Sequence, residues 1–163
     1  MGFNYGQPLV AVGAGTVVEA VDGLPDQIPN HKVPVTFAEA DGNHVILKLA
    51  DGVYAGYAHI RPGPVRVKVG DRVRVGQVVG ELGNSGNSGG PHLHFQLMDR
   101  PSLLLADGLP FVLRRFDLSG FATSLDTFIQ ADLDGTPVPI DTTVTRRDQG
   151  FTGLEVVSFP GRS

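Results

Sequence analysis

The chain has 163 residues, a length typical of one domain with at most a small appendage. A chain of this length can bury a hydrophobic core without disulfide cross-links. It contains no cysteine, which excludes disulfides and thiolate metal ligands, and its net charge of −4 offers no basic surface for nucleic acid. No apolar run approaches the ~20 residues that span a bilayer, and no signal peptide precedes the first strand pattern. We therefore expect no nucleic-acid partner and no membrane span.

The 22 glycines, 12 prolines and many valines favour an all-β protein with tight turns. Residues 9–12 and 15–21 are apolar runs that predict two short strands, separated by a glycine turn at residues 13–15. Residues 22–39 hold three prolines among polar residues, which predicts a loop. His31 lies in that loop, and we expect it to be an exposed histidine without a function.

Residues 43–50 alternate between apolar and other side chains, which is the period of a strand. The alternation places Val45 and Leu47 on one face. His44 falls on the opposite face, and we expect it to be a surface residue.

The dipeptide at residues 51–52 is Asp-Gly, the strongest short signal for a hairpin in the chain. Residues 53–60 are therefore predicted to return as the partner strand. Simple alternation on that strand puts Tyr57 and His59 on the same face.

Residues 65–83 alternate short valine runs with turns at Gly70 and Gly76. This pattern also occurs in biotinyl and lipoyl carrier domains, but such a domain needs a modifiable lysine at a hairpin tip. Residues 84–90 contain no lysine, so we discount the carrier function. The charged side chains within the valine runs predict a solvated face: Arg66, Lys68, Arg72 and Arg74.

The C-terminal part of the chain shows weaker patterns. Residues 111–115 predict a short strand, and residues 116–163 combine sparse apolar pairs with polar turns. We expect one main domain over residues 1–115 and a small β and loop extension over residues 116–163, with no site in the extension.

The most informative stretch begins with a glycine- and serine-rich loop over residues 83–90, which runs into Pro91, His92 and His94. One leucine separates the two histidines, and this strand spacing projects both to the same side. The apolar residues at the alternate positions are expected to enter a core: Leu93, Phe95 and Leu97. Two imidazoles on one face can serve as a metal ligand beside a general acid or base. They can equally lie on a solvent-exposed face of the strand without binding anything.

Four segments in order resemble the M23 family of zinc metallopeptidases, the lysostaphin and LytM-like peptidoglycan endopeptidases. They are residues 5–11 with 15–18 (YGQPLVA, GTVV), 57–60 (YAHI), 67–77 (VKVGDRVRVGQ), and 83–86 with 91–95 (GNSG, PHLHF). The similarity extends over about residues 5–98, and its last segment is the most specific.

The resemblance implies an antiparallel β-sheet domain of the duplicated hybrid motif type. It also implies a zinc ion held by an early His-x-x-x-Asp motif and by the second histidine of His-x-His, which is His94 here. His92 and His59 match histidines that transfer protons or stabilise the transition state. The implied activity is hydrolysis of peptidoglycan cross-link peptides, or of another peptide substrate, by zinc-activated water, and the family leads us to expect an extracytoplasmic or secreted protein.

The sequence departs from the family in one respect, because no His-x-x-x-Asp stands ahead of residues 5–12 and the first histidine is His31. We consider three explanations, in this order. The chain is a fragment or a mis-started frame whose ligands lie upstream; or it is a degenerate, non-catalytic domain that binds peptidoglycan or a partner hydrolase. In the third, His59, His92 and His94 form a three-imidazole zinc site by themselves.

Overall fold

The computed structural model describes residues 4–28, 31, 33–121, 124, 126, 130, 134, 136, 144–149 and 155–158. The chain divides into two compact units. One is Asn4–Leu109, and the other combines Met1–Phe3 with Pro110–Ser163.

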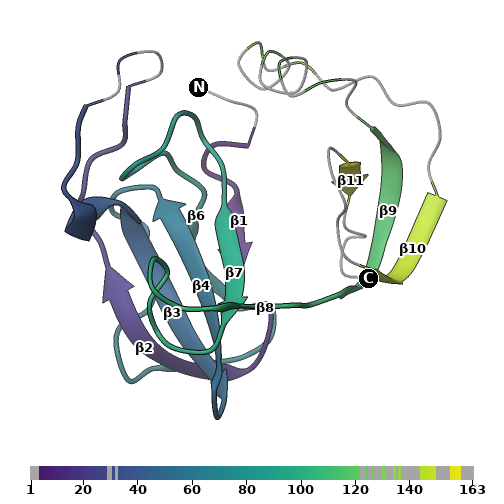
Figure 1. Cartoon of the computed structure of the whole chain (residues 1–163), viewed down its shortest axis with the longest axis horizontal. Helices are drawn as coiled ribbons and strands as arrows, with labels where there is room; N and C mark the ends of the chain where they lie inside the picture. Colours follow the sequence, from purple (N-terminus) through teal and green to yellow (C-terminus); the bar gives the residue numbers. More distant parts are fainter. Residues whose placement is uncertain are drawn as a thin grey trace. The chain divides into compact units, whose positions relative to one another are not determined.

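The first unit is built on a six-stranded antiparallel sheet, coloured from purple to teal in Figure 1. In spatial order its strands are β5 (Arg72–Val73), β2 (Gly15–Val21), β3 (Asn43–Ala50), β4 (Val53–Ile60), β7 (His94–Met98) and β8 (Gly108–Leu109). A second sheet pairs β1 (Pro8–Val10) with β6 (Val78–Glu81). A single-turn 3₁₀ helix, η1 (Phe37–Glu39), interrupts the predicted loop ahead of β3.

Both faces of the six-stranded sheet carry apolar clusters, and the alternation along β3 decides which residue joins which cluster. Val45 and Leu47 belong to the larger cluster, whereas Ile46 belongs to a smaller one on the other face. The prediction for this hairpin is confirmed. The three apolar residues of the His-x-His stretch also pack against the larger cluster, as expected: Leu93, Phe95 and Leu97.

The expectation that His44 is a surface residue is wrong, because its side chain is buried. Its Nδ1 lies 2.7 Å from the carbonyl oxygen of Gly42, and its Nε2 lies 3.2 Å from a carboxylate oxygen of Glu19. The neighbouring strand β2 supplies that carboxylate. Both ring nitrogens of His44 therefore have polar partners within the protein, although the ring is buried.

The valine runs predicted as short strands over residues 65–83 form strands only at β5 and β6 (Val78–Glu81), and residues 65–68 form none. Gly70 and Gly76 both have left-handed backbones, as their predicted turns require. The strands at residues 9–12 and 15–21 form, but β1 pairs with β6 whereas β2 pairs with β3 and β5. The basic side chains expected on a solvated face are exposed: Arg66, Lys68, Arg72 and Arg74. His31 is exposed as well.

The second unit contains a three-stranded antiparallel sheet. Its central strand β9 (Leu113–Phe121) pairs with β10 (Val144–Gln149) on one side and with β11 (Glu155–Ser158) on the other. β9 runs across the boundary that we expected between residues 115 and 116.

All described strand pairs are antiparallel, so the all-β fold class is confirmed. Within the described residues, no helix has the length and apolarity needed to cross a membrane.

The glycine-rich loop lies directly against the segment that leads into β3. Gly86 has a left-handed φ of +73°, and a Cβ added there would lie 2.6 Å from both the carbonyl oxygen of Ala40 and the Cα of Gly42. The N–H of Asn87 donates to the same Ala40 oxygen at 2.8 Å. Only a glycine permits this approach of two backbones.

We expect Gly86→Ala to destabilise the protein by about 2–4 kcal/mol, because it adds both left-handed strain and a backbone overlap. Gly89→Ala is the matched control, since a Cβ at Gly89 meets no heavy atom within 4 Å. Urea denaturation followed by far-UV circular dichroism measures both variants. Equal midpoints for the two variants would show that the loop is not packed as described.

Candidate active site

His59 stands near the end of β4 in an unusual backbone conformation, with a left-handed φ of 59°. The pairing of β3 with β4 shifts register between Asn43 and Val45, next to this residue. As a result Tyr57 and Ile60 both enter the larger core cluster and His59 does not. The expectation that Tyr57 and His59 share a face is therefore wrong, because a bulge and a left-handed residue break the two-residue period.

Three backbone groups hold His59 in this conformation. Its N–H donates to the carbonyl oxygen of Asp41 at 3.0 Å, and its carbonyl oxygen accepts from the N–H of Gly83 at 3.1 Å. Its ring Nδ1 lies 2.8 Å from the carbonyl oxygen of Ser85. A carbonyl oxygen can only accept, so Nδ1 carries the hydrogen and Nε2 carries the lone pair.

Burial decides the charge of this ring. Desolvation lowers the pKa of His59 to about 4, with smaller lowering contributions from His92 and His94 and an opposing contribution from the bond to Ser85. His59 is therefore neutral at pH 7, with its Nε2 available as a proton acceptor.

His92 lies in the irregular segment before β7 and is exposed, so the expectation that it belongs to the strand is wrong. Regular pairing begins at His94 opposite Ala58, and it goes no further because the next residue of β4 is the left-handed His59. The Nδ1 of His92 is 2.9 Å from the carbonyl oxygen of Gly90. By the same acceptor argument, Nδ1 is protonated and Nε2 carries the lone pair.

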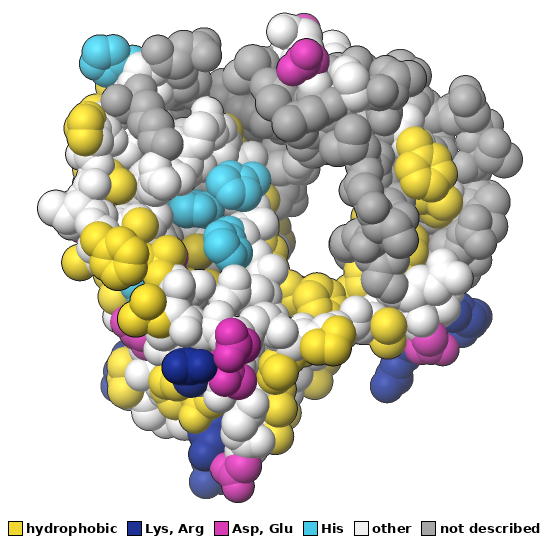
Figure 2. Space-filling model, viewed as in Figure 1, with side chains coloured by type: hydrophobic (Ala, Val, Ile, Leu, Met, Phe, Trp, Pro, Cys, Tyr) yellow, Lys and Arg dark blue, Asp and Glu magenta, His cyan; other side chains and the backbone are white. Residues whose placement is uncertain are grey.

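His94 is the first residue of β7 and is half-buried. Its Nε2 lies 3.0 Å from the side-chain oxygen of Gln96. The ring centroid of His59 is 4.7 Å from that of His92 and 5.9 Å from that of His94. The structure thus brings together all three histidines singled out in the sequence, and Figure 2 shows histidine side chains gathered on one face.

Asp41 joins this region although nothing in the sequence indicated it. Its carboxyl group is half-buried, and burial raises its pKa, whereas the nearby His44 and His94 lower it. Asp41 also lines a cavity of about 200 Å³ together with His44 and Glu19, and exposed apolar side chains form part of its wall. No spacing rule could have found Asp41, because its place depends on the long-range bond from the N–H of His59.

The described residues do not complete a metal site. No group of three or more His, Asp and Glu side chains among them is arranged to hold a metal ion. The three-imidazole site considered from the sequence is therefore not formed in this arrangement. His94 remains the one described residue that matches a zinc ligand expected from the resemblance.

Comparison with known proteins relates the chain to peptidases. It is 38% identical over 96 residues to the glycyl-glycine endopeptidase ALE-1 of Staphylococcus capitis, covering 58% of this chain and 22% of that protein. It is 29% identical over 93 residues to the peptidoglycan DD-endopeptidase ShyC of Vibrio cholerae, covering 57% and 18%. The matched region thus spans less than a quarter of either relative.

Among solved structures, the catalytic domain of lysostaphin from Staphylococcus simulans matches with 34% identity and a TM-score of 0.47, covering 64% of this chain and 68% of that one. The model of Peptidase family M23 matches residues 1–104. Because this match covers well over half of the 163 residues, the chain belongs to peptidase family M23.

Proposed function

We propose that this chain acts as an M23-type endopeptidase on peptide bonds in peptidoglycan cross-links. The observation that carries the proposal is the cluster of His59, His92 and His94, in which two rings keep an Nε2 lone pair without a partner among the described residues. The substrate class is supported by the relatives, which are named as glycyl-glycine and DD-endopeptidases. Such an enzyme would act on the cell wall, outside the cytoplasm.

In this proposal the two histidines with free Nε2 atoms have different tasks. His59 is buried and neutral, so its Nε2 accepts a proton in the reaction, while the Ser85 carbonyl keeps the ring oriented. His92 is exposed, so its Nε2 can reach a bound peptide and, once protonated, donate to the oxygen on which negative charge develops. The Gly90 carbonyl orients His92 in the same way.

The family implies zinc, and we propose His94 as a ligand to it. The described residues do not complete the site, so we assign no step of the reaction to the metal. The alternative is a non-catalytic domain that binds peptidoglycan or a partner hydrolase, and the experiments below separate the two.

Peptide hydrolysis by the full chain, supplied with zinc, should release new amino groups from purified peptidoglycan. We expect His59→Asn and His92→Asn each to lower the rate by about 10²–10⁴-fold, the usual contribution of a general acid or base. His31→Asn is the control, because His31 is exposed and outside the cluster. Wild-type rates in both cluster variants would remove the proposed roles.

Zinc affinity under a competing chelator tests the ligand assignment directly. Zinc that the chain retains should be lost in His94→Ala and kept in His31→Ala. Full zinc retention in His94→Ala would disprove the assignment. A chain that neither retains zinc nor hydrolyses peptidoglycan, but still sediments with it, would establish the binding-module alternative.

The pH dependence of stability should report the buried neutral state of His59. Its pKa is about 4 in the folded protein against an ordinary histidine value of 6.5, so between these values the unfolded chain takes up a proton that the folded chain excludes. Stability should therefore fall as the pH drops from 6.5 towards 4, by at most about 1.4 kcal/mol per pH unit from this group. His59→Asn, which tolerates the left-handed backbone, should lose this part of the slope in urea titrations. An identical pH dependence of stability in the wild type and in His59→Asn would contradict the assignment of this slope to His59.

A further inference from the structure

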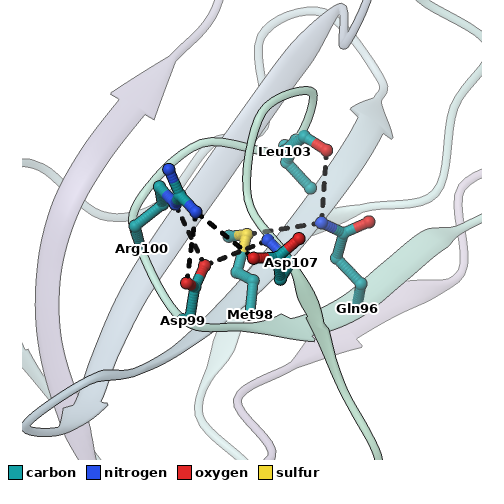
Figure 3. Close-up of polar contacts among 6 residues, drawn as sticks. All are labelled: Gln96, Met98, Asp99, Arg100, Leu103 and Asp107. Atoms are coloured by element: carbon teal, nitrogen blue, oxygen red, sulfur yellow. Dashed lines mark hydrogen bonds and ion pairs between the residues drawn. The ribbon is translucent and has the colours of Figure 1, made fainter.

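A tightly closed loop follows β7, and Figure 3 shows the contacts that close it. Arg100 donates to a carboxylate oxygen of Asp99 at 3.1 Å and to one of Asp107 at 3.3 Å. The N–H of Asp107 donates to the Asp99 carboxylate at 3.0 Å, and the N–H of Asp99 donates to the carbonyl oxygen of Asp107 at 3.2 Å. These contacts hold the two ends of residues 99–107 together.

The middle of the loop packs onto the smaller apolar cluster of the sheet. Leu103 is 6% exposed and packs there with Met98. Beneath them lies Gly56, where an added Cβ would come within 2.5 Å of Leu103 Cδ2 and 2.8 Å of Met98 Cε. The absence of a side chain at Gly56 therefore lets the loop approach the strand.

This packing brings the carbonyl oxygen of Leu103 to Gln96. The side-chain nitrogen of Gln96 donates to that oxygen at 3.2 Å and contacts Met98 Sδ at 3.4 Å, as Figure 3 shows. The opposite orientation of the amide would set two oxygens against each other, so the loop decides which way the amide faces. The amide oxygen then lies 3.0 Å from the Nε2 of His94.

An amide oxygen accepts and never donates, so the Nε2 of His94 carries the hydrogen and its Nδ1 is left with the lone pair. We propose that Gln96 is a positioning residue that fixes the tautomer and the ring orientation of His94, and that residues 99–107 set the orientation of Gln96. Partners of this kind orient metal-ligating histidines in many proteins. The inference rests on the proposed function only in giving His94 the role of a zinc ligand.

The test uses ¹⁵N NMR of the imidazole rings in the full chain without added metal, above neutral pH. In the wild type we expect His94 to show a protonated Nε2 and an unprotonated Nδ1, with a slowly exchanging Nε2–H. Gln96→Met keeps an unbranched side chain without an acceptor, and it should speed that exchange by about tenfold, the factor expected for losing one hydrogen bond.

Two controls make the comparison specific. Gln77→Met removes an exposed glutamine whose side-chain oxygen accepts from the N–H of Arg74, and it should leave His94 unchanged. In every spectrum the Nδ1–H of His59, which bonds to Ser85, serves as an internal reference.

An unprotonated Nε2 on His94 in the wild type would overturn the inference, and so would unchanged exchange in a folded Gln96→Met. If Gln96→Met does not fold, Arg100→Ala takes its place, and it should speed exchange of the His94 Nε2–H by releasing the loop. Unchanged exchange in Arg100→Ala would also overturn the inference. These readouts do not require hydrolysis. An inactive chain with the expected spectra would reject the proposed function alone, whereas an active chain with the opposite tautomer would reject this inference alone.

Discussion

The buried hydroxyl and carbonyl groups of Ser85 form the junction on which the candidate site depends. The hydroxyl donates to the carbonyl oxygen of Ile60 at 2.7 Å and accepts from the N–H of Asn43 at 2.9 Å, while the carbonyl oxygen receives the ring of His59. One serine thus joins the glycine-rich loop to the start of β3 and to the end of β4. The close approach of Gly42 and Gly86 follows from this junction, because the two backbones must meet for the serine to reach both strands.

The three histidines show how one side-chain type acquires different properties from its surroundings. His59 is enclosed by backbone and neighbouring rings, so desolvation keeps it neutral. His92 is exposed in the irregular segment before β7, where a carbonyl orients it but water still reaches it. His94 stands on a strand and is oriented by a side chain rather than by the backbone. The buried ring of His59 beside the exposed ring of His92 suits a division of proton-transfer tasks between the two histidines.

The two faces of the six-stranded sheet have separate roles. The larger apolar cluster on one face supplies most of the buried core. On the other face, the smaller cluster fastens residues 99–107 onto the sheet, and this packing extends through Gln96 to His94. The geometry of the site therefore depends on apolar packing as well as on polar contacts, since Leu103 carries both the side chain that packs and the carbonyl that orients Gln96.

The sequence by itself determined the Asp-Gly hairpin with its two strands, the His-x-His stretch and the M23 family, because strand period, turn residues and motif order are local properties. Tertiary structure alone decided the burial of His44, the left-handed backbone at His59 and the position of His92 outside the strand. It also decided that Asp41 lies next to His59. Alternation reveals which residues share a face but not what covers that face, and Glu19 of a neighbouring strand covers His44. The conformation of His59 likewise depends on acceptors and donors at residues 41, 83 and 85, which no local pattern relates to it.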